Sequence, residues 1–310
     1  MPGTTVGLLH PGEMGAALGR CLVEQGHTVL WAPQGRGPAT AHRAAAAGLT
    51  EAASLADLTA RSAVILSVCP PQAARAVAES VTGAPGGFGG LYVDANAIAP
   101  QTVRALAEVV TKAGAAFTDG GIIGLPPRPG SSDLLSQPGS PGGPSQPGSP
   151  GGPGLYLSGD GAAEVAALFG GTPVRAEVVD GGVGAASAVK LAYAAWTKGS
   201  AALLLAARAL ARAERVEGTL LAEWGVSQPA LGRGAESAAQ SAAAKGWRWD
   251  AEMTEIATAM AGAGLPDGFG RAAAEIFRCA PTADPAALSD VAPGDVVELV
   301  LEALTGDHLS

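Results

Sequence analysis

The chain has few of the residues that stabilise secreted or metal-binding domains. Its 310 residues include only three cysteines, Cys21, Cys69 and Cys279, which lie far apart in the sequence. An odd number of widely spaced cysteines, with no Cys-x-x-Cys pair, argues against both a disulfide framework and a zinc site. We therefore expect a reducing compartment and no bound metal.

Basic residues and long apolar runs are also scarce. The 19 lysines and arginines are scattered and the formal net charge is -9, which argues against a nucleic-acid partner because phosphate binding needs clustered cations. The most apolar stretch, Gly199 to Ala207, lies between Lys198 and Arg208 and is too short to span a bilayer. The first residues lack the pattern of a signal peptide. We expect a soluble, cytoplasmic protein that does not bind membranes.

Aromatic residues make up 4% of the chain, whereas 47% of its residues are hydrophobic. The core must therefore consist mainly of alanine, valine and leucine, which suits close helix packing and short buried strands. A chain of this length exceeds one ordinary hydrophobic core. We expect two domains.

The order of apolar runs predicts an α/β domain followed by a helical one. Up to about Arg175, short β-branched or apolar runs alternate with alanine-rich stretches, which is typical of a parallel sheet with helices. The predicted strands are Thr5–Leu9, Thr28–Ala32, Ala63–Val68, Leu91–Asp94, Ala115–Asp119, Leu155–Ser158 and Val174–Val179. The predicted helices are 12–25, 38–47, 71–81, 100–113 and 162–169. After Gly184 the alternation stops, and one long helix is predicted from Ala185 to about Glu214. We place the domains at 1–180 and 181–310.

Residues 126–154 fit neither pattern. They contain a nine-residue Pro/Gly/Ser unit twice in succession, at Ser136–Pro144 and Ser145–Pro153. Such tracts bury too little apolar surface to offset the entropy of ordering. The segment is predicted to be a disordered insertion.

The turn after the first predicted strand has the pattern of a dinucleotide-binding site. A glycine at position 12 lets the backbone approach a pyrophosphate, and Gly15 lets helix and strand pack closely. The following helix directs its N-terminus at the phosphates. His10 replaces the first glycine of the usual G-x-G-x-x-G pattern, and we interpret it as a turn residue with a solvated ring. The predicted cofactor contacts here are His10, Pro11, Gly12, Glu13 and Met14, and they define a Rossmann-type domain.

The residues after the second predicted strand indicate which cofactor binds. An acidic residue there would hold the free 2′-hydroxyl of NAD, and none is present. The segment instead contains Gly35 and Arg36, with Thr40 and Arg43 following. A guanidinium group suits a 2′-phosphate, although Arg36 has an alternative as a solvated loop charge. The prediction is NADP(H) in preference to NAD(H).

Several motifs together resemble the β-hydroxyacid dehydrogenase superfamily. They are the Gly12–Gly15 turn, Gly26-His27, Asp94-Ala95-Asn96, Asp119–Gly124, and Gly182-Val183-Gly184 followed by Lys190. The superfamily includes 6-phosphogluconate dehydrogenase, 3-hydroxyisobutyrate dehydrogenase and the imine reductases. Within it, the chain resembles most a poorly characterised branch with a phosphogluconate-dehydrogenase-like C-terminal domain. The resemblance implies a Rossmann domain followed by an all-α domain, and a homodimer.

The resemblance also assigns roles to residues at the strand ends. Val68, Cys69, Pro70 and Asn96 would border the nicotinamide ribose. The substrate loop would include Gly120, Gly121 and Ile122. The serine that usually precedes the glycine pair of this loop in the family is absent. The loss of its hydroxyl donor argues against recognition of the family's usual carboxylate substrate. Cys69 has no neighbouring histidine to activate it, and we interpret it as a packed cysteine.

The long helix holds the main catalytic candidate. Lys190 lies in an otherwise apolar stretch, where a buried lysine would need a function, and helical spacing places it in one stripe with Tyr193 and Thr197. In the family the matching lysine is the acid/base, whereas the alternative is a lysine whose stem packs and whose amine reaches solvent. We predict Lys190 and Tyr193 as catalytic and Lys190, Tyr193 and Thr197 as substrate contacts. Family members often have a Lys-Asp pair near the position of Trp247 and Trp249, and Glu252 would provide the acid of that pair. The alternative is that the two tryptophans cover a domain interface.

These residues predict an NADP(H)-dependent oxidoreductase that acts on a small hydroxy acid or carbonyl compound, with Lys190 as acid/base. An imine reductase is an alternative, favoured by the missing serine and opposed by the retained Lys190. A non-catalytic NADP(H)-binding sensor is an alternative of another class. Assays with ketoacids and cyclic imines distinguish the two enzymes, and cofactor binding without turnover indicates the sensor.

Overall fold

The computed structural model describes residues 3–127, 152–281 and 291–306. The chain forms two compact units, Met1–Leu191 and Ala192–Ser310. The division falls within a long helix, whereas the sequence places the border at residue 180, before that helix. Most of the predicted insertion at 126–154 lies outside the described residues.

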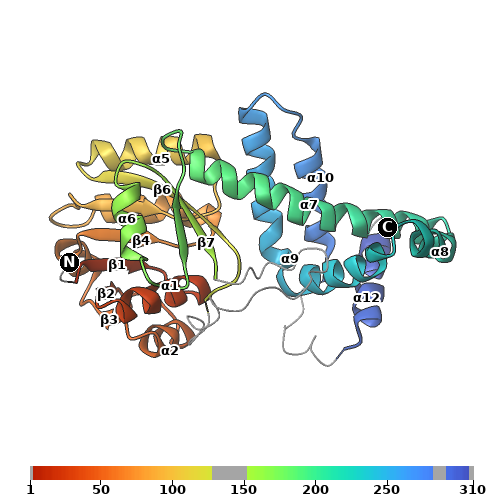
Figure 1. Cartoon of the computed structure of the whole chain (residues 1–310), viewed down its shortest axis with the longest axis horizontal. Helices are drawn as coiled ribbons and strands as arrows, with labels where there is room; N and C mark the ends of the chain where they lie inside the picture. Colours follow the sequence, from red (N-terminus) through yellow and green to blue (C-terminus); the bar gives the residue numbers. More distant parts are fainter. Residues whose placement is uncertain (1–2, 128–151, 282–290, 307–310) are drawn as a thin grey trace. The chain divides into compact units, whose positions relative to one another are not determined.

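The N-terminal unit is built around an eight-stranded sheet with the order β3-β2-β1-β4-β5-β6-β7-β8 (Figure 1). The strands are β1 (Thr5–Leu9), β2 (Thr28–Trp31), β3 (Thr50–Glu51), β4 (Val64–Ser67), β5 (Leu91–Asp94), β6 (Ala116–Ile123), β7 (Gly154–Gly159) and β8 (Arg175–Val178). Neighbouring strands are parallel, except that β7 runs antiparallel to β6. An antiparallel neighbour needs no crossover helix, which explains this departure from the predicted parallel sheet.

Helices cover both faces of the sheet. One face packs against α1 (Glu13–Glu24), α2 (Pro38–Ala46) and α6 (Ala162–Leu168). The other packs against α3 (Leu55–Arg61), α4 (Ala74–Thr82), which follows a 3-10 turn at Pro71–Ala73, and α5 (Pro100–Lys112). The sequence predicts all of these except α3, a seven-residue helix whose N-terminus is capped by the Ser54 side chain.

The C-terminal unit is helical. Helix α7 (Ala185–Ala213) begins in the N-terminal unit and continues into this one, and is followed by α8 (Glu217–Ser227), α9 (Ala230–Gly262), α10 (Gly268–Cys279) and α12 (Pro293–Gly306). Small residues allow close packing, since a Cβ at Gly270 of α10 would lie 3.0 Å from the backbone of Ala257 in α9. The two units confirm the predicted fold class, an α/β domain followed by an all-α domain.

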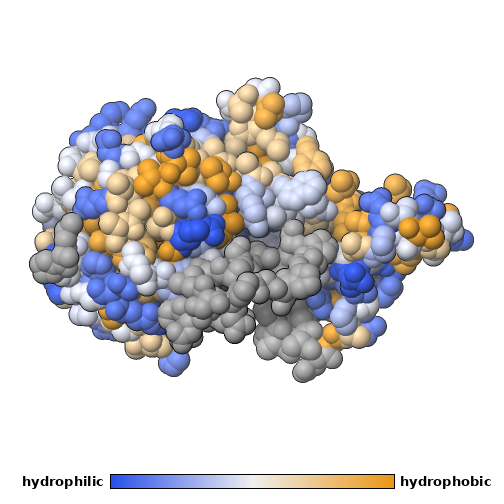
Figure 2. Space-filling view, in the orientation of Figure 1, coloured by the Kyte–Doolittle hydropathy of each residue, from blue (hydrophilic) through white to orange (hydrophobic). Residues whose placement is uncertain are grey.

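Several hydrophobic side chains of the C-terminal unit remain at its surface (Figure 2). On α7, Trp196, Leu203 and Leu210 are 73%, 60% and 65% exposed. Helix α8 has no buried residue although it contains two leucines, a valine and a tryptophan. None of the helices in the described ranges combines the length and apolarity needed to cross a membrane.

Candidate functional site

The residues predicted for the cofactor lie after the carboxyl ends of four parallel strands. The chain order reverses between β1 and β4, which are neighbours in the sheet. In open α/β sheets, ligands bind beyond the carboxyl ends of the strands at such a switch point. The predicted cofactor residues follow here: His10 to Met14 after β1, Gly35 and Arg36 after β2, Val68 to Pro70 after β4, and Asn96 after β5.

The turn between β1 and α1 has the backbone geometry that a dinucleotide requires. Gly12 is the N-cap of α1 and no side chain caps the helix. A Cβ at Gly12 would meet no atom within 4 Å, whereas a Cβ at Gly15 would lie 2.6 Å from the carbonyl oxygen of His10. Open space therefore lies before the N-terminus of α1, whose N–H groups attract phosphate. Gly15 allows α1 to lie close to the backbone of His10. Glu13 is exposed and Met14 packs against the core.

Two arginines reach this turn from the segment after β2. The exposed Arg36 contacts Nε2 of His10 through Nη2. Arg43, from α2, donates from Nε to the carbonyl oxygen of Pro11 at 3.3 Å and from Nη2 to Oγ1 of Thr40 at 3.2 Å. Gly35, just before Arg36, has a left-handed backbone with φ of 72°. Guanidinium groups beside an open helix N-terminus are suited to binding phosphate, so the residues present fit a nucleotide.

His10 differs from its interpretation as a solvated turn residue. Its Nε2 faces Arg36, and its Nδ1 is buried and has no hydrogen-bond partner within the described residues. Burial, followed by the charge of Arg36, lowers the pKa of His10 to about 4. Sequence reasoning missed this contact because the two residues are 26 positions apart.

Asn96 links the loops after β4 and β5. Its Oδ1 accepts a hydrogen bond from the backbone N–H of Cys69 at 2.6 Å. Its Nδ2 donates to Oδ2 of Asp94 at 2.8 Å and to Oγ of Ser67 at 3.3 Å. Asn96 is 3% exposed, and these contacts fix the shape of the edge where Val68, Cys69 and Pro70 lie.

The two cysteines of the N-terminal unit, Cys21 and Cys69, have raised pKa values. Burial, and next to it the charge of Asp94, raises the pKa of the Cys69 thiol to about 11. Burial likewise raises the pKa of Cys21 to about 11. Both thiols are therefore protonated at neutral pH, and thiolate is the nucleophilic form. This agrees with the interpretation of Cys69 as a packed residue.

A row of buried polar side chains crosses the sheet just below this edge. Ser67, Asp94, Asp119 and Ser158 are paired in register on β4 to β7, and each is 0% exposed. Burial raises the pKa of Asp94 to about 7, and Asp119 adds to the rise, whereas hydrogen bonds from Asn96 oppose it. The sheet thus contains two carboxyl groups without contact with solvent.

Asp119 anchors the N-terminus of α7. Its Oδ2 accepts hydrogen bonds from the backbone N–H groups of Gly184 at 2.9 Å and Ser187 at 3.0 Å and from Oγ of Ser158 at 3.1 Å, and its Oδ1 accepts one from Oγ of Ser187 at 2.6 Å. A carboxylate at a helix N-terminus is favoured by the helix dipole. The sequence assigns Asp119 only to the start of a substrate loop, since its partners are up to 68 positions away.

The predicted substrate residues of β6 lie beneath α7. Gly120, Gly121 and Ile122 are buried strand residues. A Cβ at Gly121 would lie 2.7 Å from the carbonyl oxygen of Ala186 and 2.9 Å from Cβ of Lys190. Glycine at this position therefore permits the helix to cross the strand, and it brings the half-buried Lys190 next to the end of β6.

The other predicted residues of α7 differ in exposure and contacts. Tyr193 is 39% exposed, one turn after Lys190. The hydroxyl of Thr197 donates to the carbonyl oxygen of Tyr193 at 3.1 Å, so it bonds to its own helix. The structure therefore places Lys190 against the sheet and leaves Tyr193 at the surface.

Glu252, the predicted acid of the C-terminal region, is part of an ion pair. It contacts Nζ of Lys198, and the two side chains are 15% and 13% exposed. Nζ of Lys198 also lies 5.5 Å from the ring centroid of Trp249, which packs edge-on against Phe277. Trp247 is 63% exposed. In the C-terminal unit, Glu252 thus neutralises a lysine.

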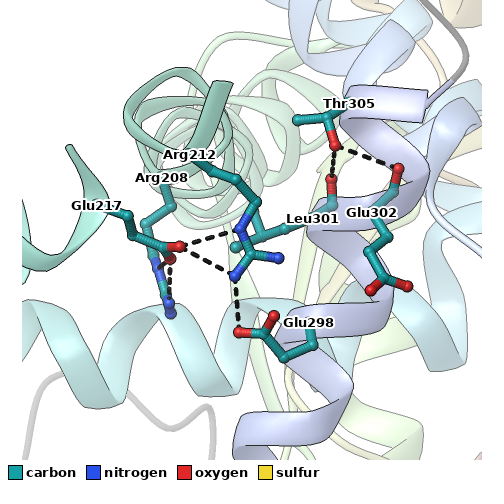
Figure 3. A network of polar contacts seen from close by, with 7 residues as sticks. All are labelled: Arg208, Arg212, Glu217, Glu298, Leu301, Glu302 and Thr305. Carbon is teal, nitrogen blue, oxygen red and sulfur yellow. Dashed lines mark hydrogen bonds and ion pairs between the residues drawn. The ribbon is translucent and has the colours of Figure 1, made fainter. Parts of the chain in front are cut away.

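A second set of charged residues joins three helices of the C-terminal unit (Figure 3). Glu217 of α8 accepts hydrogen bonds from Arg208 and Arg212 of α7, and Arg212 also pairs with Glu298 of α12 at 2.7 Å. A cavity of about 270 Å³ is lined partly by Arg208, Trp224 and Glu298. None of the predicted site residues lines this cavity.

The comparisons with known proteins agree with this geometry. Residues 5–130 match the NAD binding domain of 6-phosphogluconate dehydrogenase, and residues 211–279 match a domain of unknown function, DUF1932. A comparison with curated protein sequences finds no match. The molecule is thus an NAD(P)-binding protein with a fold like that of the 3-hydroxyacid dehydrogenases.

Solved structures match along nearly the whole chain. A conserved hypothetical protein from Sinorhizobium meliloti 1021 is 22% identical with a TM-score of 0.67, covering 98% of this chain and 97% of that one. The 3-hydroxyisobutyrate dehydrogenase of Mycobacterium tuberculosis is 18% identical with a TM-score of 0.63, covering 96% and 98%. A reductive aminase from Aspergillus terreus, in complex with NADPH and ethyl levulinate, is 20% identical with a TM-score of 0.52, covering 99% of this chain and 100% of that one. The chain therefore has the fold of the 3-hydroxyacid dehydrogenases, which agrees with the resemblance that its motifs predict.

Proposed function

We propose that the protein is an NADP(H)-dependent oxidoreductase that transfers hydride between the nicotinamide and a small hydroxy acid or carbonyl compound. The main support is the carboxyl edge of the sheet, where two arginines lie beside the open N-terminus of α1. Lys190 belongs to the same N-terminal unit. NADP(H) would supply the hydride. The protein's own residues would bind and orient the cofactor and the substrate, and would exchange a proton with the substrate.

The preference for NADP(H) rests on the segment after β2. No carboxylate follows this strand to accept a hydrogen bond from a ribose 2′-hydroxyl, whereas Arg36 and Arg43 both reach the turn that follows β1. Arginine binds phosphate through several N–H donors at once. Pro11, Gly12 and the first turn of α1 would hold the pyrophosphate, and Val68, Pro70 and Asn96 would shape the nicotinamide end.

The proton step is assigned to Lys190. A charged lysine amine stabilises the alkoxide that forms when a carbonyl accepts hydride, and then protonates it. In the oxidative direction the neutral amine removes the hydroxyl proton. Gly121 allows the Lys190 stem to pack at the end of β6, while Tyr193 and Thr197, on the same helix, would contact substrate.

Cofactor choice is tested by comparing kcat/KM for NADPH and NADH in the wild type and in Arg36→Ala. The wild type should prefer NADPH, and the substitution should reduce that preference about tenfold or more because a charge-assisted contact is lost. Arg61→Ala, at an exposed surface pair with Asp57, is the matched control. A wild type that prefers NADH would contradict the assignment.

The role of Lys190 is tested with Lys190→Met, which keeps the stem and removes the amine. Its kcat should fall on the order of 10²–10⁴-fold while NADPH affinity changes little. Lys112→Met, at an exposed position on α5, controls for the loss of a lysine. If a deuteride isotope effect shows that hydride transfer limits the rate and the Lys190 variant stays within a fewfold of wild type, Tyr193 becomes the candidate.

Reduction of a C=N bond is the second candidate function. It is favoured by the sequence of β6, which has Asp119, Gly120 and Gly121 where the family usually has a serine before its glycines. Without that hydroxyl, recognition of a carboxylate substrate loses a hydrogen bond. Parallel assays with 3-hydroxy acids, ketoacids and cyclic imines decide between the two reactions.

A homodimer is also part of this proposal. Trp196, Leu203 and Leu210 are seven residues apart on α7, and their exposure leaves one apolar stripe on that helix. A second copy of the chain would cover such a stripe by helix packing. A two-fold symmetric contact between the α7 helices of two chains would cover the apolar stripe of both chains.

A further inference from the structure

His10 has a backbone conformation that histidine rarely adopts. Its φ is 69°, and the only other residue in the described part of the chain with positive φ that is not glycine is Arg215. Side chains with a Cβ disfavour this left-handed region, whereas glycine enters it freely. The first glycine of the usual dinucleotide turn would therefore fit this position without strain. A strained residue that persists needs a compensating contact.

The imidazole of His10 provides such a contact to Arg36. A guanidinium group only donates hydrogen bonds, so Nε2 of His10 must act as the acceptor for Nη2 of Arg36. The imidazole must then be neutral and bear its hydrogen on Nδ1. Its burial and the neighbouring guanidinium both favour the neutral form. Nε2 thus keeps a lone pair directed at Arg36 at neutral pH.

We propose that His10 is a positioning residue that holds the Arg36 guanidinium in place for the 2′-phosphate of NADP(H). The inference rests on the proposed preference for NADP(H). Arg36 is exposed and comes from a loop that contains two glycines, Gly35 and Gly37, so nothing in its own segment restrains the side chain strongly. Its contact with His10 joins it to the turn that follows β1.

The effect should appear in the affinity for the phosphorylated cofactor alone. Restricting the rotamers of one arginine before binding is worth roughly a tenfold change in a dissociation constant. NADH has no 2′-phosphate, so its affinity does not depend on where Arg36 points. A histidine that served only to shape the turn would instead affect both cofactors equally, because both contain the pyrophosphate.

The experiment compares His10→Gly, His10→Asn and the wild type by titration of NADPH and of NADH, with the thermal midpoint of the cofactor-free protein measured in parallel. Glycine accepts the positive φ and removes the acceptor, so NADPH affinity should fall about tenfold while NADH affinity stays within about twofold. The cofactor-free midpoint should not fall. Asparagine tolerates positive φ and retains an acceptor oxygen, and it should recover part of the NADPH affinity. His42→Ala, at an exposed position on α2, is the matched control.

Three results would overturn the inference. If His10→Gly leaves the ratio of NADPH affinity to NADH affinity unchanged while Arg36→Ala lowers that ratio, His10 is a turn residue and the proposed cofactor preference stands. If His10→Gly weakens both cofactors equally, its role is in the turn itself. If the wild type does not prefer NADPH, the proposed cofactor preference fails as well, and the wild-type titration alone reveals this.

Discussion

The two units hold their buried charges in different ways. In the sheet unit, Asp94 and Asp119 are held by neutral donors, namely backbone N–H groups and the side chains of Asn96, Ser158 and Ser187. In the helical unit, buried charges are held by opposite charges, as in the pairs Lys198–Glu252 and Arg208–Glu217.

The difference follows from where each architecture leaves backbone groups free. A loop beyond a strand and the first turn of a helix have N–H groups that no secondary structure uses, and these can be directed at a carboxylate. Within a helix every N–H is bonded to the preceding turn. Helices that pack side by side must therefore neutralise a buried charge with another side chain. Predictions about single substitutions follow from this contrast.

The largest expected effect is that of Asp119→Ala. It removes the acceptor of two backbone N–H groups and two hydroxyls, all buried, and a lost buried group of this kind costs about 3–5 kcal/mol in the free energy of unfolding. Denaturant unfolding measures the change. Asp160→Ala, at an exposed position after β7, should change it by less than about 0.5 kcal/mol. A loss below about 1 kcal/mol for Asp119→Ala would contradict the role of Asp119 as an anchor.

Glu217→Ala should cost less, about 2–3 kcal/mol, because it leaves Arg208 and Arg212 without a shared partner while water still reaches part of the network. Glu79→Ala, which breaks the exposed Arg75 pair, should cost at most about 0.5 kcal/mol. The contrast is sharpened by replacing a pair with apolar residues. The double change Arg208→Met with Glu217→Leu should recover much of the stability, whereas no side-chain change can replace the backbone donors around Asp119. Failure of that recovery would contradict the distinction between the units.

The pH dependence of stability should depend on Asp94. Its pKa is raised from 3.8 to about 7 on folding, mainly by burial, so the folded state binds more protons than the unfolded state between these values. Stability from this group is therefore present at low pH and is lost as the pH rises toward 7. From pH 5 to pH 8 the wild type should lose on the order of 2 kcal/mol relative to Asp94→Asn. Parallel pH curves for the two proteins would show that Asp94 does not titrate in this range.

Leu203→Lys should have the smallest effect on the stability of the fold, within about 0.5 kcal/mol, because Leu203 is 60% exposed. Its effect should be on association, since the charge lies in the apolar stripe of α7. Sedimentation should show a dimer for the wild type and a monomer for the variant. Leu265→Lys, at another exposed apolar position, should leave the mass unchanged. A wild type that sediments as a monomer would contradict the proposed dimer.

Much of the fold could be predicted from local sequence patterns. Buried parallel strands are continuous apolar runs, so β1, β4 and β5 are evident, and the Gly12 and Gly15 spacing identifies the turn. Strand β3 and helix α3 escaped prediction for physical reasons. β3 has two exposed residues, too few for any periodicity, and α3 is too short for its own amphipathic pattern to stand out.

The site was less predictable because its contacts join distant positions. Lys190 and Arg36 are predicted from their local sequence context and from the family pattern. The roles of Asp119 and Glu252 depend on partners 68 and 54 positions away, and nothing near either residue indicates them. The sequence favours a solvated turn residue at position 10 because it shows what replaces a glycine and not what the new side chain touches.

The raised pKa values of Cys21 and Cys69 have a practical consequence for measurement. Cys21 and Cys69, with pKa values raised to about 11, should react slowly with maleimides at neutral pH because little thiolate is present. Cys279, at the end of α10, is half-buried. A fluorescent label should therefore attach first at Cys279, which gives a reporter in the helical unit without removing any native cysteine.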